Sequence, residues 1–302
     1  MRFTVESWDP GYGAPIESQL EDAAQSVDPN VELPAGEWRP LPPDGPPVGD
    51  ILFVDGTRRV DAALWIDRPD DSPGFALAAT YAAGAVRCAE SATLEAVKVA
   101  RGLFTSAPAA DIESGVGAYQ VRATKGTASE ELWLGIQQRM GDLEAAAARE
   151  AGGAELLVVD GPLSHARDLD NAVGYVKTQK VHYLPVELRP VLNALPAGHR
   201  TPLFLTTTSW SRYSWYLRLA DDMGPAGGLV RCEIAGTAAA DAARTASRVS
   251  ATLPRYASAR HKDPRAPQNL YPIGGLEREL RRCLGDKELA VRALRKAAAH
   301  VA

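Results

Sequence analysis

Two apolar segments of the chain end in the same short pattern, and they constrain the fold more than any other feature. Phe53-Val54-Asp55-Gly56 and Val158-Val159-Asp160-Gly161 each place a carboxylate and a glycine directly after apolar residues. Short apolar runs that end at turn residues predict buried β-strands. The second run follows a long helical segment, which is typical of an interior parallel strand. We therefore expect an α/β protein with a mixed β-sheet flanked by helices.

Turn residues and periodicity predict the other elements. Residues 58–67 and 75–86 are expected to continue from the first apolar run as an antiparallel meander. A helix over 129–151 would have Ser129 as its N-cap and stop at Gly152-Gly153. The remaining expectations are helices over 15–26, 94–104, 238–253 and 276–301, and strands over 173–184, 202–208, 212–219 and 229–234.

The two ends of the chain carry opposite charge. Residues 1–50 hold 2 basic and 10 acidic side chains, whereas residues 242–302 hold 13 basic and 5 acidic ones. Prolines between residues 34 and 47 fix the backbone and remove amide donors. We expect an extended, acidic, Pro-rich arm over 1–50, which could wrap the domain or mediate contacts, and an α/β domain over 51–302 that ends in a basic helical segment.

The sequence excludes several classes of protein. It has no GxxxxGK[ST] phosphate loop, no GxSxG elbow, no HExxH and no CxxC motif, and its histidines lack the spacing of metal ligands. Its three cysteines are far apart and are expected to be buried and reduced. With no signal peptide and no long apolar run, the protein is expected to be soluble and cytoplasmic.

Carboxylates at strand ends suggest a metal site. Ligands bind at the carboxyl ends of strands in open α/β sheets, so Asp55 and Asp160 could share Mg²⁺ or Mn²⁺, which prefer oxygen ligands. Such ions can activate water and stabilise the leaving oxygen of a phosphodiester. Asp-Gly is also a common turn sequence, so an ordinary turn explains each pattern equally well.

Two further residues fit this metal site. Glu144, 16 residues before Asp160, lies beside small alanines that allow its helix to pack closely against a sheet. A cation would offset the cost of burying its charge, although a solvated glutamate is the simpler reading. Lys177 could neutralise a phosphate or be a surface lysine. Competing carboxylates are Glu131 and Asp142 on the same helix, and Asp61 and Asp67 on the second strand.

Basic and aromatic residues near the C-terminus suggest nucleic-acid contacts. Tyr271 could stack on a base, and four arginines could contact phosphates as a group: Arg265, Arg278, Arg281 and Arg282. Arginines on a helix surface could equally pair with Glu277 and Glu279 at a spacing of three or four residues. The aromatic cluster at 209–216 could be a stacking platform, a dimer contact or part of the core.

Taken in order, these residues resemble the NurA nuclease family. The matching stretches are Phe53 to Thr57, the helix with Glu144, Leu157 to Leu163, Gly174 to Lys177, and Asp263-Pro264-Arg265-Ala266-Pro267-Gln268-Asn269-Leu270-Tyr271-Pro272-Ile273. The resemblance covers roughly residues 50 to 285.

The resemblance implies a ribonuclease H-like core and DNA cleavage that depends on Mn²⁺ or Mg²⁺, both as a single-strand endonuclease and as an exonuclease. It implies Asp55, Glu144 and Asp160 as metal ligands, Lys177 as a catalytic partner and Tyr271 as an aromatic site residue. Family members act in DNA end processing as dimers with a HerA-type hexameric ATPase. Many of them follow the Tyr-Pro element with a histidine on the final helix, whereas this region reads Gly275-Leu276-Glu277-Arg278-Glu279 here, so either His261 takes this role or the role is missing.

Two other functions remain open. The missing histidine suggests a catalytically weak or inactive NurA-like adaptor that binds DNA and docks an ATPase ring. A nuclease that prefers RNA or DNA–RNA hybrids would use the same core.

Overall fold

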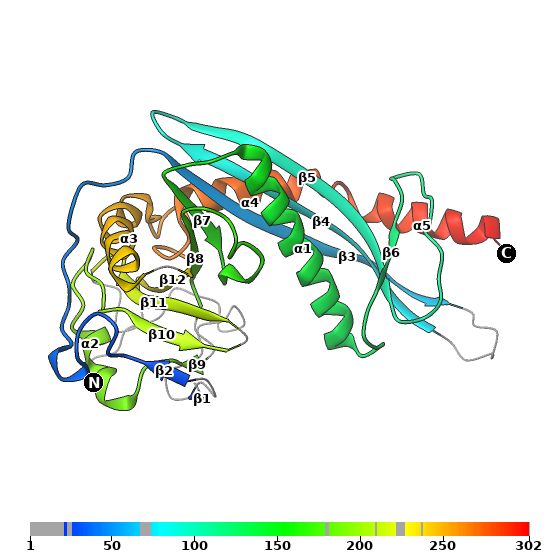
Figure 1. The fold of residues 1–302 in the computed structure, drawn as a ribbon. Coiled ribbons are helices and arrows are strands. Elements are labelled where there is room, and N and C mark those ends of the chain that lie inside the picture. The colour runs from blue at the N-terminus through cyan, green and yellow to red at the C-terminus, as the bar shows by residue number, and fades with distance from the viewer. Residues whose placement is uncertain are drawn as a thin grey trace, which may run out of the picture. The chain divides into compact units, whose positions relative to one another are not determined.

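A computed structural model describes residues 21–22, 26–66, 74–178, 181–208, 210–221, 227–236 and 238–301 (Figure 1). The fold is mixed α/β, with ten strands in one mixed sheet, as expected. The chain divides into two compact units. The α3 unit comprises residues 1–53, 87–93 and 153–274, and the α1 unit comprises residues 54–86, 94–152 and 275–302.

The α3 unit contains strands that pair in both the parallel and the antiparallel sense. Its sheet order is β2-β10-β11-β12-β8-β7, followed by the first residues of β3. Strands β7 and β8 are parallel, whereas β8, β12, β11, β10 and β2 pair antiparallel in turn. The elements are β2 (Ser26–Asp28), β7 (Leu156–Asp160), β8 (Ala172–Val176), α2 (Pro190–Asn193), β10 (Phe204–Thr207), β11 (Ser211–Arg218), β12 (Leu229–Ala235) and α3 (Ala239–Thr252), with the short parallel pair β1 (Glu21–Asp22) and β9 (Val181–His182) beside them.

The described part of the N-terminal arm packs on the α3 unit. Strand β2 extends the sheet beside β10, and Glu32 accepts two hydrogen bonds from the buried Arg200 guanidinium at 2.7 and 2.8 Å. Leu41 bridges to the backbone of the same arginine. The described residues from 26 onward thus contact the rest of the α3 unit through β2, Glu32 and Leu41. The predicted helix over 15–26 is wrong at residues 21–22 and 26, which lie in strands, and its other residues lie outside the described ones.

The α1 unit is a meander of long strands covered by helices. Its strand order is β3-β4-β5-β6, and β5 and β6 are parallel. The elements are β3 (Ile51–Ile66), β4 (Gly74–Cys88), β5 (Ala92–Thr105), β6 (Gln120–Ala123), α1 (Ser129–Ala151), α4 (Tyr271–Cys283) and α5 (Lys287–Val301), with the ends of β3, β4, β5 and α4 extending into the other unit.

Separate hydrophobic clusters attach the helices to this meander. Leu132, Ile136 and Met140 of α1 pack with Tyr81 and Phe104 in one cluster. A second cluster joins α4 to β4, and a third joins Leu294 of α5 to β4 and β5. In Figure 1, α1 runs along the strands of its unit. Its apolar stripe therefore explains why residues 129–151 form a helix in this place.

The predicted helix over 94–104 is wrong, because these residues form most of strand β5. Their Leu, Glu, Ala, Lys and Arg residues favour helix locally. Pairing with β4 and β6 overrides this preference, and the buried end of β5 contributes Leu103 and Phe104 to the core. Strand formation here depends on tertiary context rather than on local propensity.

The predicted strand end at Asp55-Gly56 is also wrong. Strand β3 continues through both residues to Ile66, so the segments predicted at 51–54 and 58–67 are one strand. The predicted end at Asp160-Gly161 is correct, because β7 stops at Asp160 and Gly161 has a φ of 104°. This left-handed backbone is one that glycine adopts easily.

Three smaller expectations also need correction. The N-cap of α1 is Ala128, with Ser129 as the first helical residue, whereas the predicted stop at Gly152 is correct with a φ of 80°. The region predicted as helix over 276–301 forms two helices, α4 and α5, separated at Gly285. Cys88 and Cys232 are buried as expected, but Cys283 is exposed.

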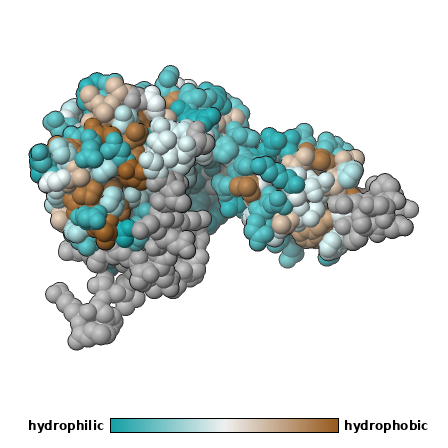
Figure 2. Space-filling model, turned by 60° about the horizontal axis from the view of Figure 1, so that its bottom comes forward, coloured by the Kyte–Doolittle hydropathy of each residue, from teal (hydrophilic) through white to brown (hydrophobic). Residues whose placement is uncertain are grey.

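Hydrophobic residues reach the described surface in patches between hydrophilic ones (Figure 2). The exposed large apolar side chains include Trp65, Trp133 and Leu134. Within the described residues, no helix combines the length and apolar character needed to span a membrane.

Candidate metal and nuclease site

Two buried carboxylates of the α1 unit flank Gly56. Asp55 is 7% exposed, and its Oδ1 accepts a hydrogen bond from the Gly56 amide at 2.7 Å. Glu144 is 9% exposed, and its carboxylate lies where a side chain on residue 56 would begin. Glycine at this position therefore gives Glu144 its place beside β3. The Glu144 carboxylate on α1 and the Asp55 carboxylate on β3 thus flank the same glycine, and carboxylate oxygens are ligands that Mg²⁺ and Mn²⁺ prefer.

Replacing Gly56 with alanine tests this packing. The new Cβ would lie 2.8 Å from Met140 Cγ, closer than Cβ atoms approach other atoms, and 3.1 Å from Glu144 Cδ, a tight contact, so both side chains would have to shift. We expect Gly56→Ala to lower the free energy of unfolding by about 1–3 kcal/mol, as overpacking does. Urea unfolding followed by circular dichroism measures this change.

Gly115→Ala is the matched control, because a Cβ there has nothing within 4 Å. Equal unfolding free energies for Gly56→Ala and Gly115→Ala would contradict the close approach of Glu144.

In the α3 unit, Asp160 and Lys177 form an ion pair. Lys177 Nζ lies 2.6 Å from Asp160 Oδ2, and each side chain is 15% exposed. Asp160 ends β7, and Lys177 follows the last residue of β8, the parallel neighbour of β7. The carboxyl ends of these two parallel strands therefore bring together a carboxylate and an ammonium group that the sequence places 17 residues apart.

The C-terminal motif at residues 263–273 also reaches this ion pair. Lys177 Nζ donates to Asn269 Oδ1 at 3.0 Å, and Asn269 Nδ2 donates to Asp263 Oδ2 at 2.7 Å. Burial favours the neutral form of Asp263, but hydrogen bonds from Asn269 and from the Arg265 amide, with the Arg265 charge, outweigh it and lower the pKa of this carboxyl.

A tyrosine from β8 fixes the same motif. The Tyr175 hydroxyl donates to the Gln268 carbonyl at 2.6 Å. Burial, together with the nearby Cys232 and Asp160, raises the pKa of Tyr175 well above its ordinary value, so the hydroxyl remains a donor at neutral pH.

The two predicted aspartates belong to different units. Asp55 of the α1 unit is the fifth residue of β3, and Asp160 of the α3 unit is the fifth residue of β7. Among the residues that the structure describes, no group of three His, Cys, Asp or Glu side chains is arranged to hold a metal ion.

The competing carboxylates have other surroundings. Glu131 lies 13 residues from Glu144 on α1, which is about 20 Å along a helix, and it packs on Gly126. Asp142 is exposed and pairs with Arg139. Asp61 accepts hydrogen bonds from Thr80, Tyr119 and Arg59 inside the α1 unit. Asp67 lies outside the described residues.

The proposed DNA-contacting residues occupy varied environments. Tyr271, the first residue of α4, is 42% exposed, and Lys262 Nζ lies 5.4 Å from the centroid of its ring. Arg265 pairs with Asp263, whereas Arg278 and His261 are exposed. Arg281 and Arg282 pair with Glu277 and Glu279, so the expectation of ion pairs along the helix surface is confirmed for these two arginines.

The aromatic cluster divides between core and surface. Trp215 and Tyr216 are fully buried, and Tyr216 stacks on Phe204, which favours the core alternative for both. Trp210 is half-buried, and the Arg212 guanidinium lies over its ring.

Sequence reasoning missed a buried charged cluster next to Asp160. Glu233 on β12 is 1% exposed and binds Arg231 at 2.5 Å and Arg212 at 3.1 Å. Its other oxygen accepts a hydrogen bond from the Leu163 amide at 2.8 Å, three residues after Asp160. Arg231 and Glu233 lie two residues apart and therefore on the same face of a strand, so their opposite charges could have indicated this cluster.

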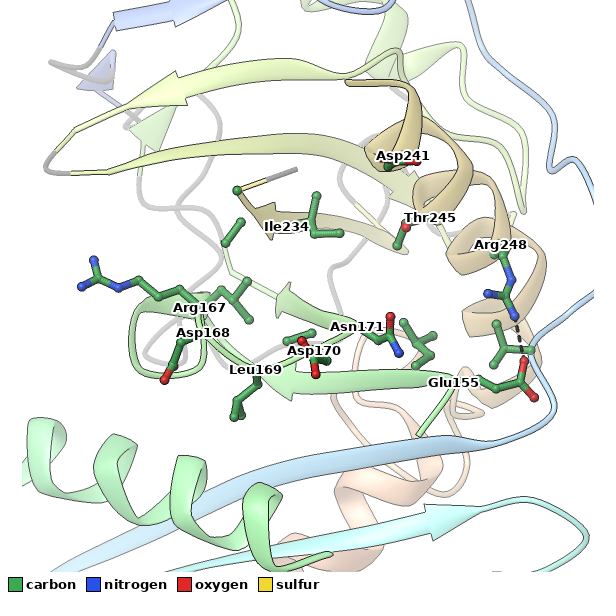
Figure 3. Close-up of a pocket in the computed structure, with 16 residues that line it drawn as sticks. Glu155, Arg167, Asp168, Leu169, Asp170, Asn171, Ile234, Asp241, Thr245 and Arg248 are labelled. Carbon is green, nitrogen blue, oxygen red and sulfur yellow. Dashed lines mark hydrogen bonds and ion pairs between the residues drawn. The ribbon is translucent and has the colours of Figure 1, made fainter. Parts of the chain in front are cut away.

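A cavity of about 390 Å³ lies elsewhere in the α3 unit (Figure 3). It is lined by the start of β7, the loop from β7 to the start of β8, the end of β12 and one side of α3. Arg167 and Arg248 contribute positive charge, whereas Asp168, Asp170 and Asp241 contribute negative charge. This mixed lining does not favour a polyanion, and none of the predicted site residues lines the cavity.

These features define a protein of the mixed α/β class, with a ten-stranded mixed sheet, two buried carboxylates beside Gly56 in the α1 unit, and an Asp160–Lys177 ion pair in the α3 unit. The chain belongs to the NurA family, because the NurA domain matches residues 49–273.

A solved structure supports the fold. The chain is similar to the crystal structure of the NurA nuclease from Sulfolobus solfataricus, with a TM-score of 0.50 and 12% sequence identity. The similarity covers 87% of this chain and 89% of that chain. A comparison with curated proteins found no match.

Proposed function

We propose that the protein is a metal-dependent DNA nuclease with a ribonuclease H-like core. Asp55, Glu144 and Asp160 bind Mn²⁺ or Mg²⁺, and Lys177 assists catalysis. The observation that carries this proposal is the pair of buried carboxylates around Gly56 in a chain of the NurA family.

The donor set suits this chemistry. Carboxylate oxygens are the ligands that Mg²⁺ and Mn²⁺ prefer, and Gly56 leaves the space in which Glu144 sits. When bound, the cation would supply Lewis acidity toward the scissile phosphate. The carboxylates would set its position, and their burial would limit competing water.

Lys177 has a separate task. Its ammonium group carries a positive charge at the end of β8 and is held by Asp160 and Asn269. Such a preorganised charge stabilises negative charge that develops on phosphate oxygens. We expect Lys177→Met to lower kcat by about 100–1,000-fold, as loss of one stabilising donor does. Single-turnover cleavage of labelled DNA measures it, and an unchanged rate would exclude this role.

Tyr271 is proposed to stack on a base, with Arg265 and Arg278 contacting the backbone. We expect Tyr271→Ala to weaken binding of single-stranded DNA by about 1–3 kcal/mol, the range of base–aromatic stacking. Fluorescence anisotropy with a labelled oligonucleotide in EDTA measures the dissociation constant without cleavage.

Tyr271→Phe is the matched control, because it keeps the ring and loses only the hydroxyl that accepts a hydrogen bond from the Ala259 amide. It should bind like the wild type. Equal affinities for the wild type and Tyr271→Ala would contradict stacking at this residue.

The family resemblance extends the proposal to a homodimer that works in DNA end processing with a HerA-type ATPase. One observation favours a second candidate: no histidine follows Tyr271-Pro272 on α4, and His261 is exposed. The alternative is a weak or inactive adaptor that binds DNA and docks the ATPase ring.

One assay separates these functions. Purified protein is incubated with labelled single-stranded DNA, RNA or a hybrid in Mn²⁺, in EDTA, and in EDTA followed by excess Mn²⁺. Cleavage of DNA that EDTA stops and Mn²⁺ restores supports the nuclease. DNA binding without cleavage overturns it in favour of the adaptor, and faster cleavage of RNA or the hybrid overturns the choice of substrate.

A further inference from the structure

We propose that Asn269, oriented by Asp263, is a positioning residue that holds the Lys177 ammonium against Asp160. The inference rests on the proposed function, because it assigns the C-terminal motif a role in preparing Lys177 for catalysis. It concerns residues of the α3 unit only.

A lysine needs acceptors to define its position. Its ammonium group ends a flexible four-carbon stem and has three rotatable donors. At Lys177 two of the acceptors are Asp160 Oδ2 at 2.6 Å and Asn269 Oδ1 at 3.0 Å. Asn269 is fully buried, so its side chain is a fixed point of attachment for the partly exposed lysine.

Asp263 determines which end of the Asn269 amide faces the lysine. Asn269 Nδ2 donates to Asp263 Oδ2 at 2.7 Å, which leaves Oδ1 as the acceptor for Lys177. Asp263 Oδ1 in turn accepts from the Arg265 amide at 2.8 Å. A reversed amide would place a donor against the ammonium group and an acceptor against a carboxylate, so this network specifies a single orientation.

The backbone of Asn269 is fixed independently. Its amide donates to the Arg265 carbonyl at 3.0 Å, and the preceding carbonyl accepts from the buried Tyr175 hydroxyl at 2.6 Å. Tyr175 lies on β8 and precedes Lys177 by two residues. Strand β8, which precedes Lys177, is thus hydrogen-bonded to the segment that contains Asn269, the acceptor for this lysine.

The Asn269 contact gives the lysine charge a direction. The amide oxygen orients the Lys177 ammonium group toward Asp160 and toward a substrate phosphate. The C-terminal motif then contributes to the site through Asn269, in a chain whose helix α4 has no histidine after Tyr271-Pro272.

A double-mutant cycle tests whether Asn269 acts through Lys177. Asn269→Ala should lower kcat by about 10–100-fold, the usual loss for a residue that orients a site group. In a Lys177→Met background, the same substitution should have no further effect. If the kcat losses of Asn269→Ala and Lys177→Met multiply in the double variant, the proposal is overturned. The control is Asn193→Ala, at an exposed asparagine of α2, which should not change kcat.

Exchanging the residues at positions 263 and 269 should rescue activity that each single substitution lowers. Asp263→Asn or Asn269→Asp alone disrupts the donor–acceptor order. Together they restore it, because the carboxylate introduced at position 269 would accept hydrogen bonds from both Lys177 and the amide introduced at position 263. The double variant should recover kcat to within about threefold of the wild type. A double variant slower than both single variants would overturn the proposed order of hydrogen bonds.

Chemical labelling tests, without metal or DNA, whether Asn269 holds the Lys177 ammonium group in place. Acetylation of Lys177 by an amine-reactive ester, followed by mass spectrometry, should rise several-fold in Asn269→Ala and stay constant at exposed Lys287. Unchanged labelling of Lys177 would overturn the positioning role. If wild-type protein cuts no DNA but the labelling changes as expected, the nuclease proposal fails while the positioning of Lys177 stands.

Discussion

Asp160→Asn should reduce Mn²⁺-dependent DNA cleavage by about 1,000-fold, the largest effect that we expect from a single substitution. Asparagine keeps the shape of the side chain but removes the negative charge that would bind the cation and pair with Lys177. Metal contributions of several kcal/mol to a transition state correspond to about three orders of magnitude in rate. Single-turnover cleavage of end-labelled single-stranded DNA measures the loss.

The control is Asp170→Asn, at an exposed aspartate of the same unit. It should cleave at the wild-type rate, and circular dichroism should show that both variants are folded. A folded Asp160→Asn protein that cleaves as fast as Asp170→Asn would remove Asp160 from the site.

Glu233→Gln should have the largest effect on stability. Glu233 is 1% exposed and lies between Arg231 and Arg212, whose side chains are 4% and 9% exposed. Removing its charge leaves two buried guanidinium groups without their carboxylate. Breaking a buried pair in this way costs about 3–5 kcal/mol of unfolding free energy. Urea unfolding of the full chain measures the cost.

An exposed ion pair gives the matched comparison. Glu155 and Arg248 lie 2.8 Å apart, with side chains 53% and 45% exposed. Glu155→Gln should cost at most about 1 kcal/mol, as surface pairs do. If Glu233→Gln costs no more than Glu155→Gln, the buried cluster does not stabilise the strands around Asp160.

The two Asp-Gly patterns show what the sequence could and could not predict. Both follow apolar runs, and both predict the end of a strand. At Gly161 the backbone turns with a φ of 104°, but β3 continues through Gly56 for ten more residues. The difference arises because β3 pairs with β4 in a long meander. A four-residue pattern in the sequence contains no information about such pairing.

The burial of Glu144 could be predicted from its neighbours, because small alanines beside it let α1 approach the sheet. The reason for its position, the missing side chain at Gly56, could not, since 88 residues separate the two in the sequence. The helix expected over 94–104 failed for a related reason, because sheet pairing overrode a local preference.

Asn269 and Asp263 are the residues that sequence reasoning passed over. Both belong to the motif that carries the family resemblance, in which only Arg265 and Tyr271 were singled out. Their roles depend on a buried network that joins residues more than 80 positions apart, such as Lys177 and Asn269. A neutral asparagine gives no charge pattern from which such a contact could be inferred.

Binding of Mn²⁺ tests the central claim most directly. Calorimetric titration of metal-free protein should show binding to the wild type, and a loss of affinity of at least about tenfold in each of Asp55→Asn, Glu144→Gln and Asp160→Asn, since each removes a proposed ligand. Asp170→Asn should bind like the wild type. Equal Mn²⁺ affinity in all five proteins would contradict a metal site formed by these three carboxylates.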